Sequence, residues 1–291
     1  MISLIIASWN RVAEPERLLK SLDEQTYSDF EVILIDQNCD NRLDRALRQH
    51  SRLRIHHLHS ERGVSKARNV GLRIAQGDII GFPDDDCWYP QELLAGVKDW
   101  FESHPEFSVL FTATRDERGR LMAPKFPLGR GACTKISVLR CAVTFNAFAR
   151  THVVKAVGMF REDIGPGTSS PYQSGEDLDY LIRPVEYGFP TWYEPNFAVY
   201  HPELKSRRRL LRTTYPYALG VGHVLRLHNY SRWVIADSLL RSLCGAGVQL
   251  CKLDVEGAGL YVLRAKGLIR GYFGEHKSST KSAEPQSGDA Q

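Results

Sequence analysis

The sequence predicts an α/β fold with a Rossmann-like, mostly parallel central sheet flanked by helices. Short apolar runs alternate with amphipathic stretches through the first hundred residues, which is the pattern of successive βαβ units. Two of these runs end directly in acidic residues, and open α/β sheets bind ligands outside the carboxyl ends of their strands. With 43% hydrophobic residues, the 291-residue chain can bury a substantial core in one large domain or two.

The elements of this first part are expected in a regular order. Their predicted ranges are strand 2–7, an amphipathic helix with Leu18, Leu19 and Leu22 on one face, strand 31–36, helix 40–49, strand 53–58, helix 65–75 and strand 79–83. The first strand leads into a loop with Arg11, the second ends in Asp36, and the fourth ends in an acidic cluster. These side chains are therefore predicted to share one edge of the sheet.

The acidic cluster consists of three consecutive residues, Asp84, Asp85 and Asp86. Carboxylates packed this closely repel one another, and a hard divalent cation with bound phosphates is a common compensation. A solvated acidic turn is the alternative. Their position directly after a strand favours a ligand site.

Several segments in this order resemble the family 2 glycosyltransferases with the GT-A fold, over about residues 1 to 205. The resemblance is carried by residues 7–11, by 25–31 leading to Asp36, by 63–71, by the aspartate triplet and by 174–177. It implies an inverting, metal-dependent glycosyltransferase of the hexosyltransferase type, as in bacterial surface-polysaccharide assembly. Such an enzyme moves a sugar from a nucleotide-sugar donor to a hydroxyl of a glycan acceptor.

The resemblance also implies the donor-binding residues. Asp36 is expected to hold the nucleobase, Arg68 to meet the phosphates or base, and the others to line the pocket: Ala7, Ser8, Arg11, Asp84 and Asp85. By the residues alone, Asp36 can instead be a helix N-cap or turn residue, and Arg68 a solvated charge. Arg62 stands where family members often have asparagine, which leaves the identity of the nucleotide open.

The metal is expected to be Mn²⁺ or Mg²⁺, because both ions prefer oxygen ligands and share them with a diphosphate. The resemblance assigns Asp86 and His201 as its ligands. His201 directly follows a short apolar run at 196–200, and a lone histidine at a strand end can equally be a surface or hydrogen-bonded residue.

The candidate base lies in a predicted helix downstream. Ser174 has an acid three residues further on, so it is predicted to cap this helix, with Glu176 and Asp177 in the first turn. These acids can simply complement the helix dipole, which is worth about 0.3–1 kcal/mol. The resemblance instead implies that Asp177 is the general base and that Glu176 lies on the acceptor side. The turn-rich stretch 165–171 is interpreted as a loop over that side.

Composition narrows the alternatives. A net charge of +4 without any recognisable nucleic-acid-binding motif predicts no nucleic-acid partner. Six cysteines without a C-x-x-C pair are interpreted as reduced thiols of a cytoplasmic chain. A nucleotidyltransferase would need a glycine-rich, lysine-bearing loop after the first strand, which residues 7–11 lack. A non-catalytic nucleotide-sugar-binding or scaffold subunit remains an alternative, although the intact acids count against it.

The remainder is divided into a helical region, 206–274, and a tail, 275–291, predicted to be disordered from its Ser, Lys, Gln, Pro and Gly content. Charged residues interrupt every apolar stretch, so no uncharged run long enough to span a bilayer is expected. The basic run 205–212 suggests peripheral contact with an anionic membrane at the inner face of the cell membrane and a polyprenyl-linked acceptor. Ordinary helices packed on the catalytic domain are the alternative.

Overall fold

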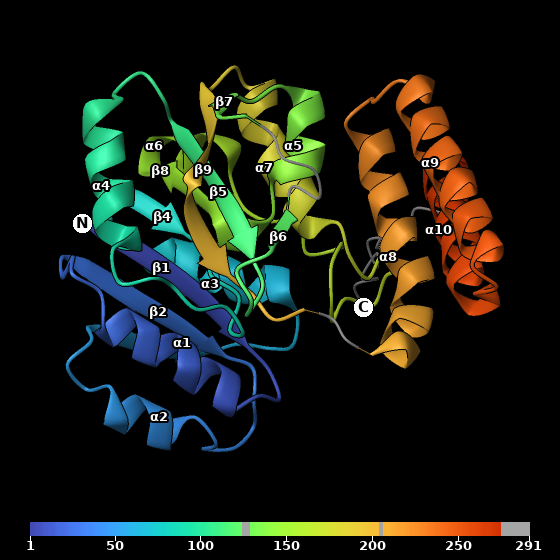
Figure 1. The fold of residues 1–291 in the computed structure, drawn as a ribbon. Helices are drawn as coiled ribbons and strands as arrows, with labels where there is room; N and C mark the ends of the chain where they lie inside the picture. The colour runs from blue at the N-terminus through green and yellow to red at the C-terminus, as the bar shows by residue number, and fades with distance from the viewer. Residues whose placement is uncertain (124–128, 204–205, 275–291) are drawn as a thin grey trace, which may run out of the picture.

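The computed structural model describes residues 1–291 except 124–128, 204–205 and 275–291. The predicted disordered tail therefore lies outside the described residues. Among those described, nine strands form one central sheet with helices on both faces. Three helices form a layer beside it: α8 (Arg207–Leu227), α9 (Arg232–Cys251) and α10 (Val255–Phe273) (Figure 1). The predicted α/β architecture is confirmed.

The first part of the sheet is parallel, in the order β3-β2-β1-β4. Its strands are β1 (Ile2–Ser8), β2 (Phe30–Asp36), β3 (Ile55–His59) and β4 (Ile79–Gly81), and the connecting helices are α1 (Ala13–Asp23), α2 (Asp44–Gln49) and α3 (Val64–Ile74). Helix α2 starts four residues later than predicted, because the carboxylate of Asp40 binds the backbone and guanidinium of Arg42 in a turn. Strand β3 begins two residues later and ends one residue later than predicted, and its last residue, His59, pairs with Asp36.

The second part of the sheet is mixed. Strand β8 (Ala147–Arg150) runs antiparallel between β4 and β5 (Val109–Arg115), and β9 (Thr191–Tyr200) returns parallel to β5. Short strands β6 (Leu121–Ala123) and β7 (Gly131–Ala132) complete the sheet. The parallel order predicted from the βαβ pattern thus describes the first part, while the sheet as a whole is mixed.

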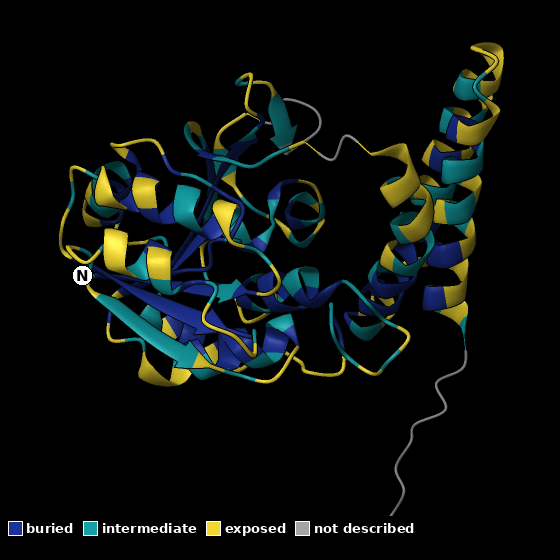
Figure 2. Ribbon diagram, turned by 90° about the horizontal axis from the view of Figure 1, so that it is seen from below, coloured by how far each residue is buried: buried dark blue, intermediate teal, exposed yellow. Residues whose placement is uncertain are grey.

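Each face of the sheet has its own apolar core. One core contains Ile2, Leu4 and Ile6 of β1, covered by α1 and α4 (Leu93–Ser103), and the other contains Ile5 of the same strand. The second core is covered by α3, α5 (Lys135–Cys141), α6 (Thr151–Val157) and α7 (Glu176–Glu186). Figure 2 shows the strands as the buried centre of the molecule. This alternation along one strand explains why both faces carry helices.

Helices α8 (Arg207–Leu227) and α10 (Val255–Phe273) pack against each other through glycines. A Cβ atom built on Gly271 would lie 2.1 Å from the carbonyl oxygen of Leu219, and one on Gly222 would lie 2.5 Å from that of Leu268. Helix α8 also meets the main domain: a Cβ on Gly220 would lie 1.9 Å from the carbonyl oxygen of Ser174. The backbone of α8 therefore contacts the backbones of α10 and of Ser174 directly, which only glycine permits at these positions.

Helix α9 (Arg232–Cys251) is different, because most of its apolar side chains are exposed, as Trp233 is at 83%. By length and composition it could cross a membrane: an 18-residue window has a mean hydropathy of 1.3, and 17% of that window is buried. The sequence predicted no uncharged run of this length, and charged residues do interrupt this helix, where Asp237 and Arg241 form an ion pair of 2.8 Å. One such helix is weak evidence for a membrane span.

Candidate active site

The carboxyl ends of β1, β2 and β4 meet as predicted. Ser8 pairs in register with Asp36, and the Ser8 hydroxyl donates a hydrogen bond of 2.7 Å to Asp85 Oδ2. Ala7 pairs with Ile35 one step earlier in the same strands. These residues proposed for the donor pocket therefore lie at or next to the carboxyl ends of neighbouring strands.

Arginine and histidine neutralise part of the aspartate triplet. Arg11 Nη1, from the loop after β1, lies 2.5 Å from Asp85 Oδ1 and 2.7 Å from Asp86 Oδ2. Burial raises the pKa of Asp85 to about 6, although Arg11 and Ser8 oppose the shift. Burial also acts to raise the pKa of Asp86, but its contacts with His201 and Arg11 more than offset this effect and lower it. Arg11 was expected near the site from the sequence, but not as the cation that pairs with the aspartates.

Asp84, Asp86 and His201 form a candidate metal cluster. Each offers one ligand atom, and these atoms lie within 4.8 Å of one another. His201 Nε2 lies 3.2 Å from Asp86 Oδ1, so the two predicted ligands are brought together. Asp84, assigned by sequence to the donor, joins them. Two carboxylates and one imidazole are a donor set that fits Mn²⁺ or Mg²⁺ with diphosphate oxygens completing the sphere.

Arg68 of α3 connects this cluster with the candidate base. Its side chain is 3% exposed, with Nη1 at 2.6 Å from Asp177 Oδ1 and Nη2 at 2.9 Å from Asp84 Oδ1. Nη2 also donates to Thr144 Oγ1 at 2.7 Å. Burial raises the pKa of Asp84 to about 7, with Arg68 opposing the shift and Asp177 and Asp86 adding to it. The alternative that Arg68 is a solvated charge is wrong.

Helix α7 carries Glu176 and Asp177 in its first turn, as predicted, but its cap differs from the prediction. The N-cap residue is Gly175, with a φ of 102°, and no side chain caps the helix. The hydroxyl of Ser174 instead donates to the carbonyl of Tyr217 in α8 at 2.9 Å. Burial and the neighbouring Asp177 raise the pKa of Glu176 to about 8. The acids lie at the helix start without the predicted capping box.

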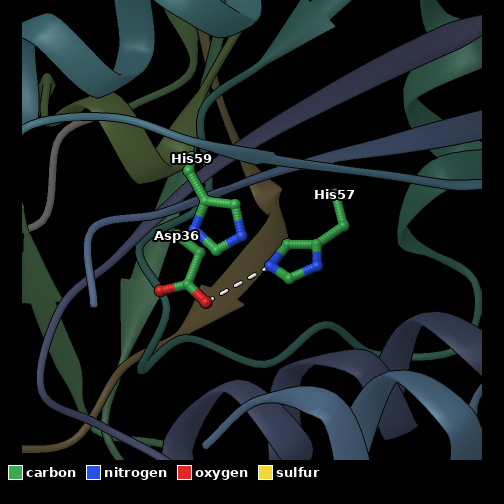
Figure 3. A group of neighbouring side chains, drawn as sticks. All are labelled: Asp36, His57 and His59. Atoms are coloured by element: carbon green, nitrogen blue, oxygen red, sulfur yellow. Dashed lines mark hydrogen bonds and ion pairs between the residues drawn. The ribbon is translucent and has the colours of Figure 1, made fainter. Parts of the chain in front are cut away.

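Asp36 is fully buried at the end of β2. Its Oδ1 accepts hydrogen bonds from the backbone N–H of Asn38 at 2.8 Å and from Asn38 Nδ2 at 2.7 Å. Its Oδ2 lies 3.2 Å from His57 Nε2 (Figure 3). The N-cap alternative is wrong, because α2 begins at Asp44. Asp36 does act as a turn residue through Oδ1, which binds Asn38, and its Oδ2 takes no part in that turn.

Residues 165–171, interpreted as a loop over the acceptor side, contact the turn before α3. The N–H of Val64 donates to the carbonyl of Pro166 at 3.2 Å, and the backbone at Gly167 lies against Gly63. The guanidinium of Arg62 lies 4.0 Å above the ring of Trp9, beside the end of β1. This loop therefore borders the donor side as well.

Sequence reasoning missed a polar network behind α7. His228, which follows α8, lies 2.7 Å from Glu186 through Nδ1 and 3.1 Å from Asp179 through Nε2. Lys135 lies 2.5 Å from Glu186. Burial acts to lower the pKa of His228, but hydrogen bonds and charges of the two acids raise it overall. The network ties the helix of the candidate base to the C-terminal layer, and no local sequence pattern marks it.

This sheet, with acidic residues at its strand ends, is an α/β fold of the kind that binds ligands outside the carboxyl ends of its strands. Residues 3–157, more than half of the chain, match the model described as Glycosyl transferase family 2. The chain belongs to this family.

Two relatives and two solved structures extend the comparison. An uncharacterized glycosyltransferase of Haemophilus influenzae is 28% identical over 205 residues, covering 69% of this chain and 65% of the relative. Glycosyltransferase AglE of Haloferax volcanii is 26% identical over 215 residues, covering 69% and 66%. In both cases the match spans just under two thirds of the relative's own length.

The solved structures agree with the GT-A prediction at the level of the fold. The mannosyltransferase PcManGT from Pyrobaculum calidifontis, in complex with GDP-Man and Mn²⁺, has a TM-score of 0.61 at 16% identity, covering 94% of this chain and 88% of that one. S. aureus TarS 1–349, in complex with UDP-GlcNAc, has a TM-score of 0.59 at 16% identity, covering 94% and 93%. At this identity the likeness shows the fold alone.

Proposed function

We propose that this protein is an inverting, metal-dependent glycosyltransferase, and that it moves one sugar from a nucleotide-sugar donor to a hydroxyl of a glycan acceptor. The observation that carries the proposal is the Arg68 bridge between Asp84 and Asp177. Asp177 on α7 and Asp84 contact the same guanidinium, and Asp84 belongs to the cluster with Asp86 and His201. A donor held at the cluster would therefore have a base beside its reacting carbon.

In this proposal Asp86 and His201 hold the metal, with Asp84 beside them. Mn²⁺ or Mg²⁺ bound there would supply Lewis-acid stabilisation of the leaving nucleoside diphosphate. The mannosyltransferase of similar fold, whose structure is a complex with GDP-Man and Mn²⁺, supports this assignment. Ser8, Arg11, Asp85 and Asp84 would line the donor pocket, with Asp36 on the nucleobase.

Asp177 is the proposed general base. Its Oδ1 accepts from Arg68, which orients the carboxylate, and its side chain keeps contact with solvent. A weak base suffices, because the acceptor hydroxyl becomes acidic only as its new bond forms. Glu176, whose pKa is raised to about 8 by burial and by Asp177, would be protonated at neutral pH and able to donate a hydrogen bond on the acceptor side.

We further propose a division into a catalytic domain, 1–205, and a helical region, 206–274, that contacts an anionic membrane at its cytoplasmic face and favours a polyprenyl-linked acceptor. Arginines 207–209 and 212 lie at the start of α8, and α9 exposes large apolar side chains. Each basic residue near an anionic surface is worth about 1 kcal/mol. Apolar and basic groups on one layer support peripheral attachment.

Calorimetry with UDP, GDP and dTDP, in Mn²⁺ and in chelator, tests the proposal. We expect one nucleotide to bind more tightly in Mn²⁺, and Asp86→Ala to abolish this difference. Asp44→Ala, which removes a partly exposed carboxylate in α2, is the control and should retain it. Equal affinities with and without metal in the unaltered protein would reject the metal role. Turnover with a nucleotide sugar separates the enzyme from a scaffold subunit.

A further inference from the structure

A second cluster of ligand-type side chains lies at the end of β2 and β3. The parallel register pairs Leu34 with His57 and Asp36 with His59. Because side chains alternate along a strand, Asp36, His57 and His59 all point to the same face of the sheet. Figure 3 shows the two imidazoles next to each other and close to the carboxylate, and their ring centroids are 4.9 Å apart.

The distances suit a small metal ion. His57 Nε2 and Asp36 Oδ2 are 3.2 Å apart, and one ligand atom of each of the three residues lies within 4.8 Å of the others. Zinc binds nitrogen and oxygen at about 2.0–2.2 Å, so tetrahedral ligands stand roughly 3.3 Å apart. The His57–Asp36 pair already has this separation. His59 is exposed, so its ring can rotate inward without displacing the core.

The carboxylate is oriented by neighbouring groups. Both hydrogen bonds from Asn38 go to Oδ1, and the Asn38 side-chain oxygen itself accepts from the N–H of Asn10 at 2.7 Å. Among the residues that the structure describes, no arginine or lysine forms an ion pair with Asp36. A buried carboxylate thus presents one oxygen toward two imidazoles. Outer-shell hydrogen bonds of this kind orient metal ligands in proteins.

We propose that Asp36, His57 and His59 form a binding site for a divalent transition metal, with Zn²⁺ as the favoured ion and a fourth position open to water. Two imidazoles and one carboxylate suit Zn²⁺, whereas the cluster of Asp84, Asp86 and His201 has a single imidazole and suits Mn²⁺ or Mg²⁺. The two sites would therefore differ in the metals that they select.

One consequence rests on the proposed function. If Asp36 holds the nucleobase, the oxygen that would bind Zn²⁺ is the one that the base needs, because Asn38 occupies the other. Bound Zn²⁺ would then weaken nucleotide binding while leaving the Mn²⁺ cluster intact. Zinc bound at this site would therefore inhibit the enzyme by competing with the nucleotide.

The test is titration of the chelator-stripped full chain with ZnCl₂ by calorimetry, and with CoCl₂ by visible absorption. We expect His57→Gln and His59→Ala each to weaken Zn²⁺ binding by about 100-fold or more, since even outer-shell partners are worth 10–100-fold. Two variants are controls. His201→Ala removes the imidazole of the other cluster. His50→Ala removes a histidine that pairs with Asp23 but belongs to neither ligand cluster of the described residues. Both should keep the tight Zn²⁺ site. Circular dichroism would check that each variant is folded.

Two results would overturn the proposal: Zn²⁺ affinity unchanged in both His57→Gln and His59→Ala, or tight binding lost in His201→Ala. Nucleotide binding is measured separately: the affinity for whichever of UDP, GDP and dTDP binds is compared in Mn²⁺ with and without saturating Zn²⁺. Tight zinc binding with unchanged affinity for that nucleotide would support the metal site and reject the nucleobase role of Asp36. Failure of the zinc site and failure of the donor assignment are thus distinguishable.

Discussion

Replacing Arg68 by methionine removes the guanidinium between Asp84 and Asp177 and keeps most of the aliphatic stem. Removing one partner of a buried ion pair costs about 3–5 kcal/mol, because the other charge stays buried and unpaired. Here the side chains of Asp84 and Asp177 are 34% and 28% exposed, so water can solvate part of the lost interaction. We therefore expect a loss at the low end, about 3 kcal/mol, in the free energy of unfolding.

The loss should depend on pH in a defined direction. The pKa of Asp84 is raised by burial from 3.8 to about 7, and that of Glu176 by burial and Asp177 from 4.5 to about 8. A carboxyl group with a raised pKa stabilises the fold at low pH, and this contribution is lost as pH rises through the folded-state value. The unaltered protein should thus lose stability between about pH 5 and pH 8. Arg68→Met should lose more at pH 8 than at pH 6.

Urea unfolding at pH 6 and pH 8 measures both effects. With a slope of about 3 kcal/mol per molar urea for a chain of this size, the midpoint at pH 8 should fall by about 1 M. Arg73→Met, at an exposed position of the same helix, is the matched control and should stay within about 0.5 kcal/mol. Arg68→Lys keeps a positive charge, so its loss in unfolding free energy should lie between those of Arg68→Met and Arg73→Met. A loss below about 1 kcal/mol at pH 8 would refute the assigned role of the bridge.

Three further outcomes are expected. Asp177→Asn keeps an oxygen for Arg68, so nucleotide affinity should persist while transfer falls by about 10²–10⁴-fold in a turnover assay; near-normal turnover would place the base elsewhere. Gly220→Ala should destabilise by about 1–3 kcal/mol in thermal melts, because its methyl group meets the Ser174 carbonyl, whereas Gly247→Ala in open space should not destabilise. Neutralising the arginines of 207–212 should release the chain from anionic vesicles at about 0.15 M salt in sedimentation assays, and attachment unchanged by salt or charge would argue for apolar insertion by α9.

The strand ends were predictable because hydrophobic periodicity and the βαβ order are local signals. Asp36 and the aspartate triplet follow apolar runs directly, so their position at one edge of the sheet needs no knowledge of distant contacts. The pairing of Arg11 with Asp85 and of Arg68 with Asp177 spans 74 and 109 residues. Such contacts depend on how the elements pack, and no spacing in the sequence encodes them.

One local prediction failed because a tertiary contact competed with a local one. Ser174 fits a capping box, but the close approach of α8 offers its hydroxyl the Tyr217 carbonyl instead. The histidines of β3 have no sequence signature, because only the register with β2 brings them to Asp36.

The contact between α8 and the segment before α7 limits how this enzyme can be recombined with its relatives. The family match ends at residue 157, so the helices beyond it are the natural part to exchange in a chimera that seeks a new acceptor. A transplanted helix bearing any side chain at position 220 would push the Ser174–Gly175 backbone and tilt the start of α7. Functional chimeras should therefore retain glycine at this position or carry the 174–177 segment across together with the helices.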